Sequence, residues 1–316
     1  MLASIDVVIP THNNFTLTDS CLRHLQAQTV PHHVIVVDNG STDGTAELLR
    51  ERWVNVQVER YTDRLGFARA CNLGVAAGSG EFVVLLNNDV ECRPAFLERL
   101  TAPLCADHSV GAAAALMLQP GERTIDSVGL CADVTLAAFA RLQGLPATRA
   151  GDASPALAAP SGAGAAYRRE AWSEVGGLDE QISAYVEDFE LGLRLRAAGW
   201  AVVAAVEAVA VHLGSATYGR RSADQRRRFG FGRGYVMARY RVLRSPHAIR
   251  ALTVEALVVI GDALIWRDFA ALKGRLAGWR AGRRLSPRLS PLGQAVDPEI
   301  SLRDSLSLRR AALRRS

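Results

Sequence analysis

A run of four aliphatic residues that ends in three polar side chains is the feature that most constrains the fold. Residues 83–86 read V-V-L-L, and Asn87, Asn88 and Asp89 follow directly. An unbroken aliphatic run is typical of a parallel strand that is buried on both faces. Ligands of open α/β sheets bind beyond the carboxyl ends of the strands, where a carboxylate can share a divalent cation with substrate phosphates. The same residues also favour a plain turn, so the end of this strand has two interpretations.

The first third of the chain alternates between strand and helix patterns. We expect strands at residues 5–9, 34–37, 54–59 and 83–86, and helices at residues 16–28, 45–52 and 66–77. This order is typical of a parallel, doubly wound sheet. Thr11 and Asp38 follow strands whose ends lie at the same edge as Asp89, and Asp38 is a candidate acceptor for a pyrimidine ring N–H. Neither G-x-G-x-x-G after the first strand nor G-x-x-x-x-G-K-[ST] is present, which argues against a dinucleotide site and a P-loop.

Two further candidate positions come from the second half of the chain. Glu187 and Asp188 precede a helix expected at residues 189–198, where the helix dipole favours an ionised carboxylate that is usable as a general base. The alternative is that the pair only caps this helix. A strand expected at residues 202–211 ends at His212, which is either a metal ligand or a structural histidine.

Residues 103–165 are less regular and rich in alanine. We expect strands near residues 110–118 and 128–139, and a helix that begins near Arg169. The small residues at 161–166 permit the close approach of either a ligand or a second backbone. Both interpretations stay open.

The net charge of +5 conceals a strong asymmetry. Residues 1–216 carry 15 Arg and no Lys against 25 Asp plus Glu, a net charge of −10, whereas residues 217–316 carry 22 basic and 7 acidic residues, a net charge of +15. The basic part also holds interleaved aromatic residues and an apolar helix expected at residues 252–266. This combination suggests an anionic membrane surface or single-stranded nucleic acid. The alternative is a helical subdomain that packs on the core, with a homodimer as one form of it.

Cysteine usage and hydropathy exclude several classes of protein. The five cysteines form no C-x-x-C pair, which argues against a disulfide framework and a structural zinc site. We expect neither a signal peptide nor a membrane-spanning helix, because the chain does not begin with a basic and apolar leader and holds no run of about 18 apolar residues.

Seven short segments together resemble the family 2 glycosyltransferases of the GT-A fold, and the resemblance is closest to bacterial rhamnosyltransferase-like members. The segments are V-V-I-P-T-H-N (7–13), V-V-D-N-G-S-T-D-G-T (36–45), G-F-A-R-A-C-N-L-G (66–74), L-L-N-N-D-V (85–90), G-G-L-D-E (176–180), E-D-F-E-L-G-L-R (187–194) and H-L-G-S (212–215). They occur in the family's order over residues 4–216. The resemblance implies an α/β fold with a mixed, mainly parallel nucleotide-sugar-binding sheet flanked by helices, followed by a C-terminal helical extension.

The resemblance also implies a role for each candidate residue. Asp188 would be the catalytic base and Glu187 would position the acceptor. Asp89, in a degenerate D-x-D motif, and His212 would bind a divalent metal, Mg²⁺ or Mn²⁺. The residues implied for nucleotide binding are Pro10, Thr11, Asp38, Asn72 and Asn88.

We therefore expect a catalytic domain at residues 1–218, a basic amphipathic helical extension at 219–285 and a loosely ordered basic tail at 286–316. The expected enzyme transfers a sugar, with inversion, from a dTDP- or UDP-sugar (dTDP-rhamnose is a candidate) to a cell-envelope glycan or lipid-linked acceptor. It would work in the cytoplasm at the inner face of the membrane, without a nucleic-acid partner. A nucleotidyltransferase on a similar sheet, or a non-catalytic nucleic-acid-binding protein, are the alternatives.

Overall fold

The computed structural model describes residues 4–214, 222–288 and 295–315. The strands are β1 (Ile5–Thr11), β2 (His33–Asn39), β3 (Gln57–Tyr61), β4 (Phe82–Leu86), β5 (Val90–Cys92), β6 (Val110–Leu118), β7 (Ile125–Ser127), β8 (Leu130–Ala132), β9 (Ala138–Ala140), β10 (Gly164–Arg168) and β11 (Ala201–His212). The helices are α1 (Phe15–Gln26), α2 (Thr45–Arg52), α3 (Phe67–Ala77), α4 (Phe96–Ala106), α5 (Arg169–Val175), α6 (Glu187–Ala197), α7 (Ala223–Arg239), α8 (Ala248–Trp266), α9 (Ala270–Arg283) and α10 (Leu302–Arg315).

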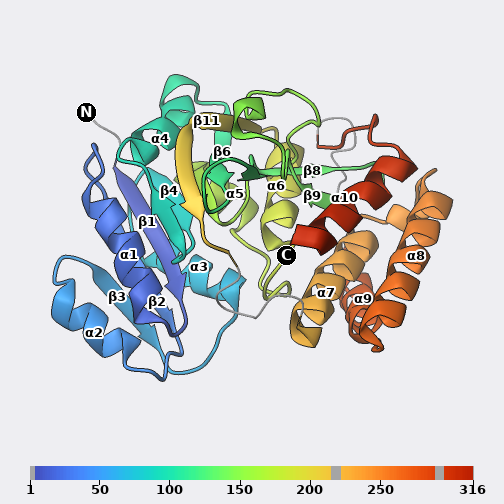
Figure 1. Cartoon of the computed structure of the whole chain (residues 1–316), viewed down its shortest axis with the longest axis horizontal. Helices are drawn as coiled ribbons and strands as arrows, with labels where there is room; N and C mark the ends of the chain where they lie inside the picture. The colour runs from blue at the N-terminus through green and yellow to red at the C-terminus, as the bar shows by residue number, and fades with distance from the viewer. Residues whose placement is uncertain (1–3, 215–221, 289–294, 316) are drawn as a thin grey trace.

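Nine of these strands form one sheet in the order β3-β2-β1-β4-β10-β6-β11-β5, with β7 paired to β6 (Figure 1). Strands β1 to β4 pair in parallel, as do β6 and β11. Strands β10 and β5 run antiparallel to their neighbours. The predicted mixed, mainly parallel sheet is thus confirmed, and β8 and β9 form a separate hairpin.

Two apolar layers cover the sheet, because successive side chains of a strand point to opposite faces. Val7 and Ile9 of β1 belong to the layer that contains α1, α2 and α4, whereas Val8 belongs to the layer of α3, α5 and α6. All three side chains are fully buried. The aliphatic strands are therefore enclosed on both sides, and the polar residues are left to the strand ends.

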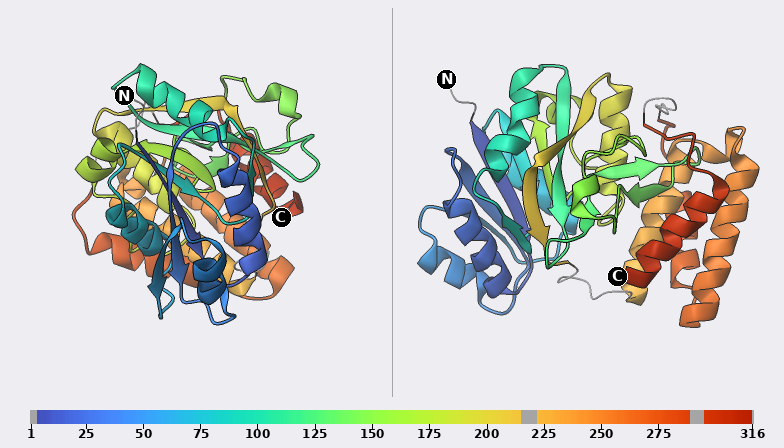
Figure 2. Two further views of the ribbon diagram at one scale, coloured as in Figure 1. Left: turned by 90° about the vertical axis from the view of Figure 1, so that its left-hand side faces the viewer. Right: turned by 45° about the horizontal axis from the view of Figure 1, so that its top comes forward.

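The C-terminal helices lie together at one end of the sheet (Figure 2). Phe189 and Leu193 of α6 share an apolar cluster with Val236 of α7 and with Tyr240 beyond it. The extension thus packs on the core, as one of the two interpretations of the basic region proposed. The expected domain boundary between residues 218 and 219 lies outside the described residues. In the described ranges no helix is both long enough and apolar enough to span a membrane.

Three segments differ from expectation. Residues 128–139 are not one strand: β8 and β9 are separated by a turn in which the Asp133 carboxylate accepts backbone N–H groups of Thr135 and Ala137. The third strand begins at Gln57, after a turn that includes Val54. Residues 302–315, expected in a loosely ordered tail, form helix α10. In the first of these segments, the Asp133 carboxylate stabilises the turn by accepting local N–H groups, and this effect outweighs the β-propensity of the residues around it.

Candidate active site

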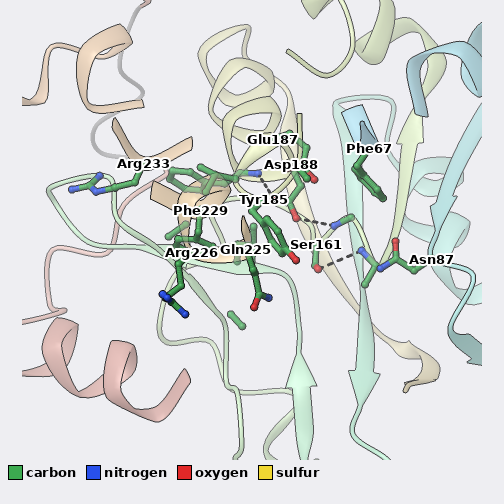
Figure 3. Close-up of a pocket in the computed structure, with 18 of the residues that line it drawn as sticks. Phe67, Asn87, Ser161, Tyr185, Glu187, Asp188, Gln225, Arg226, Phe229 and Arg233 are labelled. Atoms are coloured by element: carbon green, nitrogen blue, oxygen red, sulfur yellow. Dashed lines mark hydrogen bonds between the residues drawn. The ribbon is translucent and has the colours of Figure 1, made fainter. Parts of the chain in front are cut away.

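A cavity of about 600 Å³ lies between the carboxyl ends of the central strands and the C-terminal extension. Pro10, Thr11, Asn88 and Asp89 line it from the ends of β1 and β4, and Asp188 lines it from the start of α6. Figure 3 shows the opposite wall, to which α7 contributes Gln225, Arg226, Phe229 and Arg233. Seven of the nine site residues expected from the sequence line this cavity; they are Pro10, Thr11, Asn88, Asp89, Glu187, Asp188 and His212.

Asp89 and His212 are brought together by the pairing of two strands. Val90 of β5 is in register with His212 of β11, and the two side chains approach to 3.4 Å between Asp89 Oδ1 and His212 Nε2. The other ring nitrogen, Nδ1, lies 2.8 Å from Oδ2 of Asp126 on β7. Burial alone would lower the pKa of His212, but hydrogen bonds and charges from Asp126 and Asp89 raise this pKa to about 10.

Asp126 is a functional candidate that the sequence did not single out. Its carboxylate engages Nδ1 and so directs Nε2 towards Asp89, which is the arrangement that orients metal-binding histidines in proteins. A group of three convergent metal-ligand side chains is absent from the described part of the chain. The donor set fits a hard or borderline divalent cation that takes its remaining ligands from a diphosphate.

Glu187 and Asp188 follow two residues with left-handed backbone, Tyr185 (φ 65°) and Val186 (φ 76°). Such a conformation is unusual for a β-branched residue and is found where a site fixes the backbone. It turns the chain into α6, where Glu187 is buried and Asp188 is half-buried. Figure 3 shows the Asp188 carboxylate pointing towards the segment that contains Ser161.

The two carboxyl groups have different surroundings. Asp188 accepts backbone N–H groups of Gly162, at 2.9 Å, and Phe189, at 2.7 Å. Oε2 of Glu187 has no hydrogen-bond partner among the described residues. Burial raises the pKa of Asp188, and burial followed by the charge of Asp188 raises the pKa of Glu187 well above its ordinary value. We expected the helix dipole to favour the ionised carboxylates, but burial has the larger effect on both pKa values.

Two expected nucleotide-binding residues lie elsewhere. The Asp38 carboxylate is fully buried, accepts the Ser41 backbone N–H at 3.1 Å, and is not among the described lining residues. Asn72 is outside the described lining as well: its amide donates to the Leu178 carbonyl and accepts the Leu178 N–H, both at 2.9 Å. Asn72 therefore braces the G-G-L-D-E turn.

Other polar residues line the cavity near the end of β2. Asn39, next to Asp38, lines the cavity together with His12 and Arg64. The side chain of Asn39 accepts the Leu65 N–H at 2.6 Å and so ties the end of β2 to the loop before α3. Asn88 donates to the hydroxyl groups of Thr11 and Thr18 at 3.0 and 3.1 Å. It thus holds β1 and α1 in place as well as lining the cavity.

The basic extension contributes a wall of paired arginines. Arg233 Nε lies 2.7 Å from Glu255 of α8, and Arg275 of α9 lies 2.7 Å from the other oxygen of the same carboxylate. The Arg226 guanidinium lies 4.7 Å from the centre of the Trp266 ring. All three arginines line the cavity, so this part of the basic region faces the candidate active site.

The sequence matches two family descriptions: Glycosyl transferase family 2 over residues 6–176 and Glycosyl transferase family group 2 over residues 117–279. An O-antigen biosynthesis protein, RfbC, of Myxococcus xanthus is 30% identical over 224 residues, which cover 67% of this chain but only 17% of that protein. An N-acetylglucosaminyl-diphospho-decaprenol L-rhamnosyltransferase of Mycobacterium tuberculosis is 29% identical over 216 residues, which cover 61% of this chain and 70% of that protein.

Two solved structures support the fold. A mannosyltransferase of Pyrobaculum calidifontis in complex with GDP-Man and Mn²⁺ aligns with a TM-score of 0.52 and 22% identity, over 98% of this chain and 79% of the other. GalNAc-T7 with UDP, GalNAc and Mn²⁺ aligns with a TM-score of 0.61 and 16% identity, over 90% and 55% of the two chains. The chain belongs to glycosyl transferase family 2 and is a glycosyltransferase with the GT-A fold.

Proposed function

We propose that this family 2 enzyme is an inverting, metal-dependent glycosyltransferase that transfers a sugar from a nucleoside-diphosphate sugar to a hydroxyl group of a cell-envelope glycan or lipid-linked acceptor. The observation that carries the proposal is that Asp188 and the Asp89–His212 pair line one cavity at the carboxyl edge of the sheet. A base for the acceptor and a cation site for the donor diphosphate are the two groups that such a transfer requires.

Asp188 is the base in this proposal, and its surroundings support that choice over Glu187. The charge of Asp188 acts on the adjacent Glu187, and neighbouring carboxyl groups do not readily ionise together. The N–H groups of Gly162 and Phe189 stabilise a charge on Asp188, whereas Oε2 of Glu187 lacks a hydrogen-bond partner in the part of the chain that the structure describes. Glu187 therefore keeps the proton and Asp188 ionises. An elevated pKa brings the base closer to the working pH, where it is most effective.

The transfer itself is a single displacement. The acceptor hydroxyl loses its proton to Asp188 while its oxygen forms a bond to the anomeric carbon of the donor sugar. The bond from that carbon to the diphosphate oxygen breaks on the opposite side, so the anomeric configuration inverts. His212 would release its ring proton and, together with Asp89, would hold Mg²⁺ or Mn²⁺. The cation would supply positive charge beside the leaving nucleoside diphosphate. Asp126 fixes the orientation of the His212 ring.

The relatives support the finer part of the proposal. The name of the mycobacterial relative specifies an L-rhamnosyl group and a diphospho-decaprenol acceptor. We extend this chemistry to the present chain as a dTDP- or UDP-sugar donor, with dTDP-rhamnose as the candidate, and a lipid-linked acceptor at the inner face of the cell membrane. The names of both solved structures include a nucleotide or nucleotide sugar with Mn²⁺, which supports the choice of metal.

The substitution Asp188→Asn tests the assignment of the base. It replaces the carboxylate by a group of the same shape that cannot accept the proton. We expect transfer to fall about 10²- to 10⁴-fold, the usual contribution of a general base, with donor affinity unchanged in a calorimetric titration. Retained turnover would exclude Asp188 as the base. Loss of donor affinity together with turnover would point to a structural role instead.

A further inference from the structure

One side of helix α8 exposes large apolar side chains to solvent. Ile260 and Leu264 are 55% and 75% exposed, and Ile249 at the start of the helix is 81% exposed. Further exposed apolar residues of α8, the following turn and α9 are Leu252, Leu257, Ile265, Phe269 and Leu276. We call these eight residues the α8 apolar face. Single exposed apolar residues are common, but eight of them on one helix, the following turn and the next helix suggest an interaction surface.

The other side of α8 belongs to the active-site cavity. Val258, Asp262 and Trp266 recur at intervals of four residues, as one side of a helix requires, and all three line the cavity. Glu255 is buried between Arg233 and Arg275. The acidic residues of this helix, Glu255 and Asp262, therefore face inward, while its most exposed aliphatic residues face outward. In Figure 1, α8 lies at the edge of the molecule farthest from the sheet.

The exposed charges of the segment that carries the α8 apolar face all have the same sign. Between residues 241 and 288, every exposed charged side chain is basic. These residues are Arg241, Arg244, Arg267, Lys273, Arg280, Arg283 and Arg284. The three acidic residues of the segment, Glu255, Asp262 and Asp268, are buried or half-buried. We call these seven residues the basic rim of the α8 apolar face. The exposed acidic residue Asp304 lies on α10, which packs against α8.

We propose that the α8 apolar face and its basic rim bind the surface of an anionic lipid bilayer, with α8 lying in the plane of the interface. This inference rests on the proposed function, because it brings the wall of the active-site cavity to the surface that would carry a lipid-linked acceptor. Exposed aliphatic side chains flanked by Lys and Arg, with no exposed acidic residue between residues 241 and 288, fit a helix that lies on an anionic membrane.

The charge pattern argues against two other occupants. A two-fold dimer would place the same surface on both partners, so basic rims would meet and repel. Single-stranded nucleic acid is bound by stacking on exposed aromatic rings, but the apolar face is aliphatic apart from Phe269. An anionic bilayer supplies an apolar interior for the aliphatic side chains and negative charge for the basic rim.

The test is sedimentation of the full chain with vesicles of phosphatidylcholine mixed with phosphatidylglycerol, and with vesicles of phosphatidylcholine alone. We expect Ile260→Asp and Leu264→Asp each to weaken binding at least about tenfold, since each removes most of the transfer free energy of a buried aliphatic side chain. Lys273→Glu and Arg280→Glu should each weaken binding to the anionic vesicles roughly fivefold or more.

Matched controls come from the opposite end of the molecule. Val54, between α2 and β3, is 81% exposed, and Arg50 of α2 is also exposed; Figure 1 shows α2 and α8 at opposite ends. We expect Val54→Asp and Arg50→Glu to bind vesicles as the unmodified chain does. Equal binding by the Leu264→Asp and unmodified chains would overturn the proposal. So would a dimer in light scattering that dissociates in Leu264→Asp while neither chain binds vesicles.

Sugar transfer measured on the same samples separates this inference from the proposed function. If the unmodified chain transfers sugar but never sediments with vesicles, the membrane surface is wrong and the enzyme assignment stands. If vesicle binding follows the α8 substitutions but no nucleotide sugar is turned over, the assignment fails and the membrane surface stands.

Discussion

Replacement by alanine should change the stability of the fold in opposite directions at two glycines of the C-terminal helices. Gly278 lies at the contact between α7 and α9, whereas Gly261 of α8 faces open space. A Cβ atom at Gly278 of α9 would lie 2.0 Å from the carbonyl oxygen of Phe231 and 2.9 Å from the backbone nitrogen of Tyr235. Both obstacles are backbone atoms of α7, so no side chain can rotate away. Reaching the 3.4 Å at which ordinary contact begins requires the helices to separate by about 1.4 Å at this point.

We expect Gly278→Ala to lower the free energy of unfolding by about 1–3 kcal/mol, the usual cost of overpacking a closely packed contact. At about 2–4 °C per kcal/mol for a chain of this size, the melting temperature should fall by about 2–12 °C. Phe229 and Arg233, on the same helix as Phe231, line the cavity, so donor affinity should fall as well.

Gly261 of α8 supplies the control. Nothing lies within 4 Å of a Cβ atom built there, and the residue is inside a helix. Alanine is favoured over glycine in a helix interior by about 1 kcal/mol, so Gly261→Ala should raise the melting temperature slightly. The two variants are compared by differential scanning calorimetry. If Gly278→Ala is as stable as Gly261→Ala, the close α7–α9 packing described here is incorrect.

Two further predictions concern the site. The raised pKa of Glu187 means that the folded state retains a proton that the unfolded chain releases near pH 4.5. The stability of the fold therefore falls as the pH rises from 4.5 to the raised pKa, and it stays lower above that pKa. Glu187→Gln should stabilise the fold most at high pH in thermal melts, and a pH-independent difference between the two chains would contradict this. Asp126→Ala should weaken Mn²⁺ binding in the presence of a nucleoside diphosphate about 10- to 100-fold, with partial recovery in Asp126→Asn, whose oxygen still accepts from Nδ1; unchanged Mn²⁺ titrations would exclude the orienting role.

The fold was accessible from the sequence because its signals are local. An aliphatic run such as residues 83–86 identifies a buried strand without reference to its neighbours, and β4 is found there. Asp89 and His212 were identified individually, and the structure adds that β5 and β11 pair to join them. Family membership then favours sugar transfer over the nucleotidyltransferase and nucleic-acid-binding alternatives.

The missed features depend on tertiary contacts. Asp126 stands in a three-residue strand without a motif, and only its distance to His212 identifies it. The carboxylate of Asp38 accepts the Ser41 N–H and is not among the described lining residues, and its role in nucleotide binding stays a prediction. Ionisation of Glu187 and Asp188 could not be inferred from helix position, because burial depends on the packing of the whole cavity wall. The need for glycine in α7 and α9 is likewise visible only when the close contact between the two helices is known.

The most direct test of the central claim is the melting temperature of the purified chain with a panel of nucleoside diphosphates and nucleotide sugars, with and without Mn²⁺ or Mg²⁺. A ligand bound only by the folded state raises the melting temperature by mass action. We expect a rise of about 5–10 °C with one nucleotide at about 100 times its Kd. This rise should require the metal and should disappear in Asp89→Ala. It should persist in the control Glu51→Ala, which changes an exposed carboxylate of α2. No rise with any nucleotide, or a rise that is independent of metal and of Asp89, would contradict the proposed metal-bound donor site.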